Sequence, residues 1–168
     1  VRGSPTYPRR GLKEGCQLVQ KSLVLLKPDA VQRGLVGELI SRLERRGLKL
    51  VGMKLLQVDE ALAGRHYGEH VDRSFYRGLV DFITSSPTVA LVWEADNAII
   101  LVRQTMGETD PGKSPTGTIR GDLGINIGRN LVHGSDSPES AQREIDLFFQ
   151  PQEVLVYERN LDPWITES

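Results

Sequence analysis

The pattern of apolar and polar positions predicts short strands and amphipathic helices from residue 22 onward. An apolar run over 22–26 ends at Lys27-Pro28-Asp29, which is typical of a buried strand that enters a loop. Apolar residues at helical spacing predict a helix from Leu35 to a stop at Gly47. The other predicted elements are a strand over 48–58, short helices over 59–67 and 75–83, a strand over 88–93, a helix over 97–106, an extended piece over 130–133 and a helix that starts at Ser137-Pro138.

This order of elements, with one β-α-β half repeated, favours an α+β sandwich of the split β-α-β type with helices on one face of the sheet. At 168 residues the chain is long enough for one domain with its own core. We place that domain at residues 21–168. Residues 1–20 lack apolar periodicity, and we interpret them as a flexible leader, a tag or a processed segment, with an organelle transit remnant as the open alternative.

The charge balance is close to neutral, with 21 basic and 22 acidic residues and a formal net charge of -1. Such a chain has no general field that would attract nucleic acid or an anionic membrane, so we expect neither as a partner. Its longest apolar runs, 23–26 and 98–102, are far shorter than the roughly 20 residues that span a bilayer. Cys16 is the single cysteine, which excludes an internal disulfide and favours a reducing, cytoplasmic location.

Residues Gly107 to Ser114 match the phosphate-loop pattern G-x-x-x-x-G-K-[ST] in full. That loop needs a strand before it and a helix after it, because amides at the helix N-terminus form the phosphate cradle. Here a predicted helix precedes the pattern, and Pro115 directly follows it. We therefore interpret the segment as an exposed, turn-rich loop.

His133 is the strongest candidate for a catalytic group. A lone histidine is more often structural, but Gly134 leaves this imidazole unscreened, Ser135 lies beside it, and Glu144 lies on the next helix. A carboxylate paired with one ring nitrogen fixes the tautomer and leaves the other nitrogen as a nucleophile, which could accept a phosphoryl group.

Phosphoryl transfer also needs cations, because it depends mainly on positioning and charge stabilisation. Lys27, Arg103 and Arg120 are candidates, although the sequence alone does not show that they converge. His66 and His70 lie four residues apart and could share a metal, but the HExxH pattern is absent, so we favour a polar helix surface. Core packing is the expected role of most of the aromatic residues.

The chain resembles the nucleoside diphosphate kinases, from about residue 22 to residue 167. The resemblance is carried by two strings, KPDAVQRG at 27–34 and NLVHGSDS at 130–137. Shorter strings support it, among them MGET at 106–109 and GTIRGD at 117–122. It implies a ferredoxin-like α+β fold, with a four-stranded antiparallel sheet and helices packed on it. It also implies Mg²⁺-dependent, ping-pong transfer of the γ-phosphate of a nucleoside triphosphate, mainly ATP, to a nucleoside diphosphate such as GDP.

The resemblance also implies a role for individual residues. His133 stands at the position of the phosphorylated histidine, Ser135 and Glu144 match the residues around its imidazole, and Tyr67 matches a neighbour. The expected phosphate ligands are Lys27, Arg103, Thr109 and Arg120. Lys27 and Asn130 match the ribose contacts, and the expected base site is formed by Phe75, Leu79 and Ile127.

The resemblance implies that Mg²⁺ is held by the nucleotide phosphates with few or no protein ligands. It also implies a homo-oligomer, and the long run from Tyr157 to Trp164 favours a hexamer over a tetramer. The rival hypotheses are a relative that binds nucleotides without catalysis, an ATPase that uses the loop from Gly107 to Ser114, and a nucleic-acid-binding protein.

Overall fold

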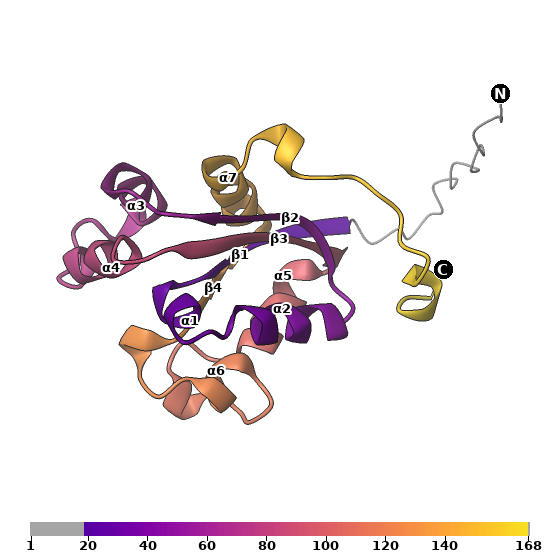
Figure 1. The fold of residues 1–168 in the computed structure, drawn as a ribbon, viewed down its shortest axis with the longest axis horizontal. Coiled ribbons are helices and arrows are strands. Elements are labelled where there is room, and N and C mark those ends of the chain that lie inside the picture. Colours follow the sequence, from indigo (N-terminus) through magenta and orange to yellow (C-terminus); the bar gives the residue numbers. More distant parts are fainter. Residues whose placement is uncertain (1–18, 168) are drawn as a thin grey trace.

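The computed structural model describes residues 19–167, in which one four-stranded sheet is surrounded by helices (Figure 1). Most of the leader predicted for residues 1–20 lies outside the described residues. Cys16 also lies outside them. The strands are β1 (Val19–Leu26), β2 (Lys49–Leu56), β3 (Thr88–Asp96) and β4 (Val132–Gly134). The α-helices are α1 (Pro28–Gln32), α2 (Val36–Arg45), α3 (Glu60–His66), α4 (Tyr76–Ile83), α5 (Ala98–Met106), α6 (Ile119–Leu123) and α7 (Pro138–Phe148).

The sheet has the order β2-β3-β1-β4, and each neighbouring pair is antiparallel. This confirms the predicted α+β class with its four-stranded antiparallel sheet. Strand β1 begins at Val19, which pairs with Asp96, so the sheet starts two residues before the predicted domain boundary at residue 21. At the other end of the same strand, Leu25 pairs with His133 of β4, and this pairing places the candidate nucleophile at the sheet.

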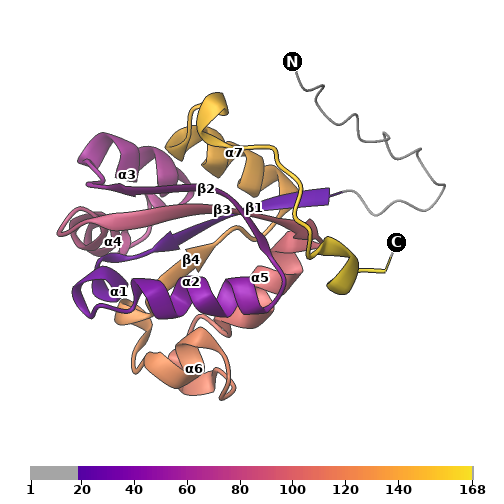
Figure 2. The same ribbon diagram turned by 45° about the vertical axis from the view of Figure 1, so that its right-hand side comes forward.

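Helices cover both faces of the sheet, which corrects the prediction of one covered face (Figures 1 and 2). Side chains alternate along β1: Val24 packs in the cluster that contains residues of α2 and α5, and Leu25 packs in the cluster that contains residues of α4 and α7. Both are fully buried. A strand buried on both sides has an unbroken apolar sequence, because neither face needs polar residues.

The ends of the helices follow from local sequence signals. Asp59 accepts a hydrogen bond from the amide of Leu62 and so caps α3, as predicted. Helix α2 ends before Gly47, whose φ of 97° is in the left-handed region that glycine adopts readily. Two short helices that we did not predict, α1 and α6, lie where the sequence favoured loops.

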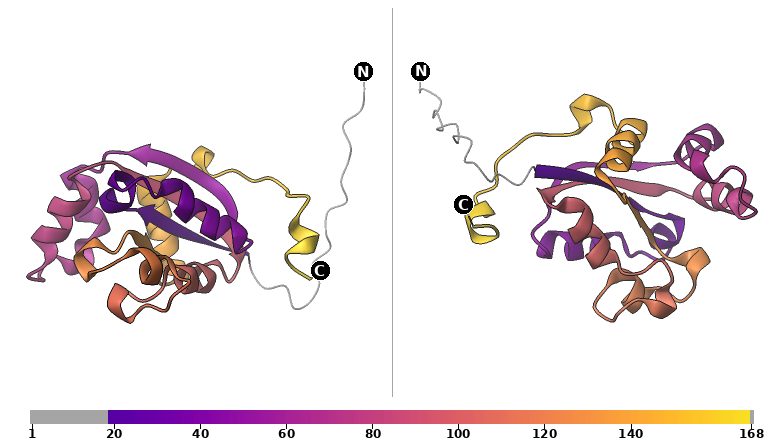
Figure 3. Two further views of the ribbon diagram at one scale, coloured as in Figure 1. Left: turned by 60° about the horizontal axis from the view of Figure 1, so that its bottom comes forward. Right: turned by 180° about the vertical axis from the view of Figure 1, so that it is seen from behind.

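The C-terminal run leaves α7 and passes along the edge strand β2, as both views of Figure 3 show. The amide of Leu155 donates to the carbonyl of Val51, and the Tyr157 hydroxyl donates to the carbonyl of Leu50. Large apolar side chains of this run remain exposed, including Val156 at 91% and Trp164 at 87%. None of the helices within residues 19–167 is both long enough and apolar enough to cross a membrane.

Candidate active site

A cleft of about 680 Å³ is lined by residues of β4, α3, α4, α5, α6 and α7 and of the loops beside them. Its volume is within the range of small-molecule sites. The sequence candidates that line it are Lys27, Tyr67, Phe75, Leu79, Arg103, Thr109, Arg120, Ile127, Asn130, His133 and Glu144. Ser135 is the one candidate that does not line the cleft; it is fully buried behind Glu144. The fold therefore brings together residues that span more than a hundred positions of the chain.

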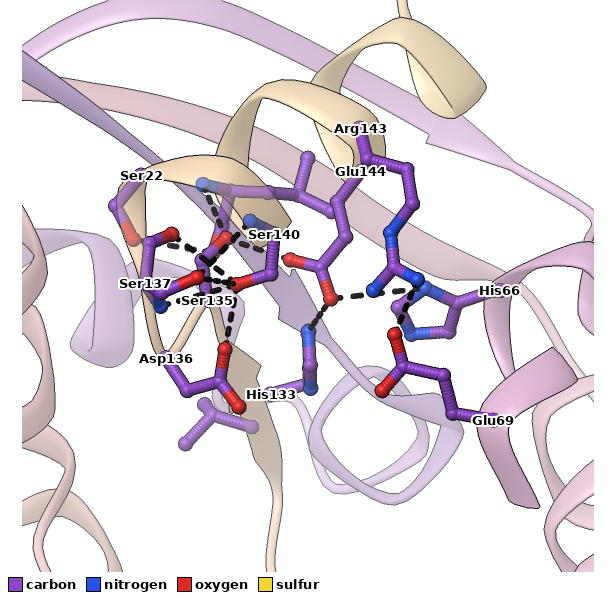
Figure 4. Close-up of polar contacts among 12 residues, drawn as sticks. Ser22, His66, Glu69, His133, Ser135, Asp136, Ser137, Ser140, Arg143 and Glu144 are labelled. Carbon is purple, nitrogen blue, oxygen red and sulfur yellow. Dashed lines mark hydrogen bonds and ion pairs between the residues drawn. The ribbon is translucent and has the colours of Figure 1, made fainter.

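The imidazole of His133 is held by a carboxylate that is itself held in place (Figure 4). Nε2 of His133 lies 2.8 Å from Oε1 of Glu144, and the Ser135 hydroxyl donates to Oε2 of the same carboxylate at 2.5 Å. Because a carboxylate accepts and does not donate, the imidazole proton lies on Nε2 and the lone pair lies on Nδ1. This is the tautomer that a nucleophilic histidine requires.

Helix α7 carries Glu144 and begins beside the histidine strand. Ser137 caps the helix by accepting from the amide of Ser140, and the Ser140 hydroxyl accepts in return from the Ser137 amide. Ser135 ties the same loop to β1, since its amide donates to the Leu23 carbonyl and its hydroxyl accepts from the Leu23 amide. These bonds fix the carboxylate relative to the sheet.

Electrostatics keep two polar groups of the cleft, Glu144 and Tyr67, in defined protonation states. Burial acts to raise the pKa of Glu144, but the hydrogen bonds from His133 and Ser135 outweigh it, so the net pKa is lowered and the carboxylate stays ionised. Burial, with a contribution from the Glu144 charge, raises the pKa of Tyr67 to about 12. Tyr67 therefore keeps a hydroxyl proton that it can donate into the cleft.

Two cations of the cleft are buried without a carboxylate in hydrogen-bonding contact, within the part of the chain that the structure describes. Lys27 donates to Oδ1 of Asn130, and burial lowers its pKa from 10.5 to about 8. Arg120 donates to three backbone carbonyls, those of Gly107, Asn130 and Val132, at 2.7–3.2 Å. Burial, followed by the nearby charge of Arg103, lowers the pKa of Arg120 to about 10. Buried positive charge without a directly bonded carboxylate favours an anionic ligand.

The segment before His133 has strained backbone. Leu131, which is fully buried, has φ of 71°, in the left-handed region that costs a residue with a side chain about 1–2 kcal/mol. Three contacts hold it: its amide donates to Oδ2 of Asp29, its carbonyl accepts from the amide of Lys27, and its side chain packs in the core. On the other side of the histidine, a Cβ at Gly134 would lie 2.6 Å from the sulfur of Met106, so a larger residue would push β4 from α5.

The mouth of the cleft is apolar and exposed. Phe75 is 54% exposed and Ile127 is 61% exposed, and both line the cleft with the half-buried Leu79. The expectation that most aromatic residues pack in the core holds for Trp93, which is fully buried, and fails for Phe75. Thr109 also lines the cleft, and its carbonyl accepts from Nδ2 of Asn130. Exposed apolar groups beside buried cations are suited to a ligand with a flat apolar end and an anionic end.

We predicted that His66 lies on a polar helix surface, and this prediction is wrong. His66 is buried against His133. Its side chain is 2% exposed, and its ring centroid lies 4.8 Å from that of His133 in an edge-to-face arrangement. Burial, followed by the charge interaction with His133, lowers the pKa of His66 to about 3, so its imidazole is uncharged near neutral pH. Helix α3 ends at His66, so His70 belongs to the next, 3-10 turn and does not share a helical face with it. Helical spacing alone could not reveal this.

The loop from Gly107 to Ser114 does not form a phosphate cradle. It follows helix α5, a 3-10 turn occupies Pro111–Lys113, and the Lys113 side chain is 80% exposed. A helix before this loop and Pro115 after it are the flanking features from which the sequence already argued against a phosphate loop. Sequence reasoning missed a rim ion pair between Arg143 and Glu69, and a ring contact between Arg129 and Phe82 whose centres lie 4.1 Å apart. No motif marked these residues, because they come together only in the folded chain.

The fold and the cleft together present a carboxylate-oriented histidine beside buried cations, an arrangement that suits an enzyme acting on a phosphate-bearing ligand. Comparison with known proteins identifies the family. Residues 20–154 match the model of the nucleoside diphosphate kinase family. A nucleoside diphosphate kinase of Carboxydothermus hydrogenoformans is 57% identical over 149 residues, which cover 89% of this chain and all of that protein.

Solved structures agree with this assignment. A halophilic nucleoside diphosphate kinase from Halobacterium salinarum in complex with CDP has a TM-score of 0.86 and 49% identity, with 88% of this chain and 99% of that chain covered. A nucleoside diphosphate kinase family protein from Babesia bovis has a TM-score of 0.85 and 41% identity, at the same coverage. The chain belongs to the nucleoside diphosphate kinase family, and it is an enzyme of the phosphotransferase class. The neighbours also confirm the ferredoxin-like fold.

Proposed function

We propose that the protein transfers the γ-phosphate of a nucleoside triphosphate, mainly ATP, to a nucleoside diphosphate through a phosphorylated His133. The observation that carries this proposal is the 2.8 Å contact between Nε2 of His133 and Oε1 of Glu144, which leaves the Nδ1 lone pair for attack. In the first half-reaction, Nδ1 forms a bond to the γ-phosphorus, and the bond from that phosphorus to the β-phosphate oxygen breaks. The bonding electron pair leaves with the nucleoside diphosphate.

The second half-reaction reverses these steps on another nucleotide. A terminal oxygen of the acceptor diphosphate bonds to the phosphorus, the N–P bond breaks, and its electron pair returns to Nδ1. Nε2 keeps its proton throughout, and the positive charge on the phosphorylated imidazole is balanced by the ionised Glu144. Splitting one transfer into two lets a single nucleotide site serve both substrates.

The other cleft residues bind and position the nucleotide in this proposal. Lys27, Arg103 and Arg120 stabilise the charge of the transferred group, with help from Thr109 and the Tyr67 hydroxyl. Asn130 and Lys27, which are hydrogen-bonded to one another, contact the ribose hydroxyls. Phe75, Ile127 and Leu79 hold the base. An apolar clamp of this kind contacts the π-face that every base has, which supports tolerance of different nucleotides.

Mg²⁺ fits this cleft as an ion held by the nucleotide. The described carboxylates that line the cleft already have partners: Glu144 binds His133, Glu69 binds Arg143, and Asp136 accepts from Ser140. Mg²⁺ prefers oxygen ligands and often takes them from phosphates at such sites. When bound, the ion would neutralise phosphate charge, and this chain would orient the phosphates through its cations.

We also propose that the enzyme is a cytoplasmic homo-oligomer, with a hexamer favoured over a tetramer. The edge strand β2 supports assembly, because Met53 and Leu55 on it are 58% and 67% exposed. Apolar residues of the C-terminal run, such as Val156, add to this surface. Sedimentation equilibrium at several protein concentrations tests it: a mass of six chains supports the hexamer, and a single-chain mass contradicts any assembly.

The test of the mechanism is the mass of the intact protein after brief incubation with ATP and Mg²⁺, and again after GDP is added. We expect one acid-labile phosphoryl group that GDP removes as GTP, and none on His133→Gln. Lys113→Ala is the matched control, because the phosphate-loop hypothesis predicts loss of activity there and retention in His133→Gln. Absence of the adduct in folded, nucleotide-bound protein would favour a relative that binds nucleotides without catalysis.

A further inference from the structure

The most unusual group near the cleft is the imidazole of His66. Neither Nδ1 nor Nε2 of this ring has a hydrogen-bond partner among residues 19–167, although both atoms are buried. Buried polar atoms are almost always paired, and leaving one unpaired costs about 1–3 kcal/mol. The ring nevertheless lines the cleft, with its edge against the imidazole of His133.

Three groups with lone pairs converge at this point. Nδ1 of His66 lies 3.9 Å from Oε1 of Glu144, and the same oxygen lies 2.8 Å from Nε2 of His133. Figure 4 shows the Glu144 oxygen between the two imidazoles. One ligand atom from each of the three residues lies within 4.8 Å of the others.

We propose that His66, His133 and Glu144 form a binding site for a zinc-like divalent transition-metal ion, and that the ion switches off phosphoryl transfer. Two imidazoles and one carboxylate are a ligand set that binds Zn²⁺, with the fourth position left to water. The ligand atoms of tetrahedral zinc lie roughly 3.3 Å apart. The widest separation here, at most 4.8 Å, must therefore shrink by no more than about 1.5 Å when the ion binds.

The ligand set differs from that expected for the Mg²⁺ that we propose accompanies the nucleotide. Imidazole nitrogens suit zinc, copper and nickel, whereas Mg²⁺ takes oxygen ligands in a strict octahedron. Excess Mg²⁺ therefore competes poorly for His66 and His133. The cleft would discriminate by ligand chemistry between an ion that accompanies the substrate and an ion that inhibits the enzyme.

Inhibition follows from the tautomer of His133. The ion replaces the proton on Nε2, and a proton from solvent then occupies Nδ1, so the ring loses the lone pair that attacks phosphorus. The buried cations and the apolar clamp are left in place, so nucleotides still bind. We therefore expect zinc to lower the rate of His133 phosphorylation and to leave nucleotide affinity almost unchanged. This consequence rests on the proposed function, whereas metal binding itself does not.

Binding is tested directly with Zn²⁺ and with Co²⁺, whose visible absorption is intense in tetrahedral sites and weak in octahedral ones. All proteins carry Cys16→Ser, because a thiol would compete for either ion. We expect one equivalent bound with a tetrahedral Co²⁺ spectrum, and an at least roughly tenfold weaker affinity in His66→Phe, since even indirect disturbance of metal ligands costs 10–100-fold. His66→Phe keeps a planar ring and loses no hydrogen bond to the part of the chain that the structure describes.

Two further variants make the result decisive. His70→Phe removes a histidine that also lines the cleft but is exposed, and this variant should bind the ion as the unmodified site does. If His66→Phe does not fold, His66→Asn removes the imidazole with a smaller side chain. Equal affinity in the unmodified and His66 variants, or a purely octahedral Co²⁺ spectrum, would overturn the proposal.

The functional consequence is measured as the rate of His133 phosphorylation by ATP and Mg²⁺ at a fixed free Zn²⁺ concentration, held by a metal buffer because nucleotides chelate zinc. Each protein is compared with its own zinc-free rate. We expect at least tenfold inhibition of the unmodified enzyme and less than twofold inhibition of His66→Phe. Stoichiometric binding without inhibition would refute the switch, while absence of phosphorylation without zinc would refute the proposed function instead.

Discussion

The buried charge of Lys27 should lower the free energy of unfolding of the nucleotide-free protein. The variant Lys27→Met, which removes this charge, tests this prediction. Burial lowers the Lys27 pKa from 10.5 to about 8, so the folded protein binds this proton more weakly than the unfolded chain does. Below about pH 8 the folded state keeps the proton at a cost of about 3 kcal/mol, because one unit of pKa is worth about 1.4 kcal/mol. The cost shrinks between pH 8 and 10.5, as the folded state releases the proton first. It is close to zero above that window.

The pH dependence is the decisive quantity, because packing changes in Lys27→Met are the same at every pH. Relative to the variant, the unmodified protein should gain about 2 kcal/mol of unfolding free energy between about pH 7 and about pH 9.5. Urea unfolding at a fixed protein concentration measures it. Lys113→Met, whose side chain is 80% exposed, serves as the control and should show a flat difference.

A bound nucleotide should change this result in a defined direction. Phosphate charge beside the ammonium group favours its protonated form and raises the pKa of Lys27. The pH-dependent difference from Lys27→Met should therefore flatten when a nonhydrolysable ATP analogue is present at saturation. Parallel pH curves for the nucleotide-free proteins would refute the reasoning, because they would show that Lys27 is no harder to protonate in the folded state.

Three further predictions follow from the site and the core. Glu144→Gln should slow histidine phosphorylation by about 10²–10⁴-fold, because the two groups that donate to the carboxylate would meet an amide with one acceptor. Glu139→Gln on the same helix is the control and should have no effect. Rapid-quench kinetics measures the rate, and a loss under fivefold in Glu144→Gln would contradict the prediction. Phe75→Ala should weaken the binding of adenine and guanine nucleotides alike by about tenfold, as measured by calorimetry. Weaker binding of only one of the two bases would argue against a shared stacking face. Leu43→Ala, at a fully buried position, should lose about 2–5 kcal/mol in urea unfolding, whereas Leu161→Ala, at a 63% exposed position, should lose little.

Much of the fold could be predicted because the local signals agree with the tertiary structure. Asp59, Gly47 and Ser137 each lie at the helix end that the sequence indicates. The covering of both sheet faces was missed, although β1 and β3 contain unbroken buried runs. Such runs are typical of strands buried on both sides, and attention to them would have corrected the prediction.

The residue strings predicted which side chains gather at the cleft. They did not predict the burial or the pKa values of these side chains. No spacing rule shows that Lys27 and Arg120 are buried without a carboxylate hydrogen bond from the described residues, or that His66 turns inward from the end of a helix. These properties arise from the meeting of segments that lie far apart in the chain. A single sequence indicates which groups are present, but burial decides their charge.

The left-handed backbone at Leu131 has a consequence for how the protein opens. Its amide and carbonyl are bound by Asp29 and by the backbone of Lys27, so the unfavourable conformation persists only while the first strand and the histidine strand remain docked. We expect hydrogen–deuterium exchange at the Leu131 amide to proceed at the same rate as at the amides that join β1 and β4. The catalytic end of the sheet would then be gained or lost as one cooperative unit, without a half-formed nucleophile.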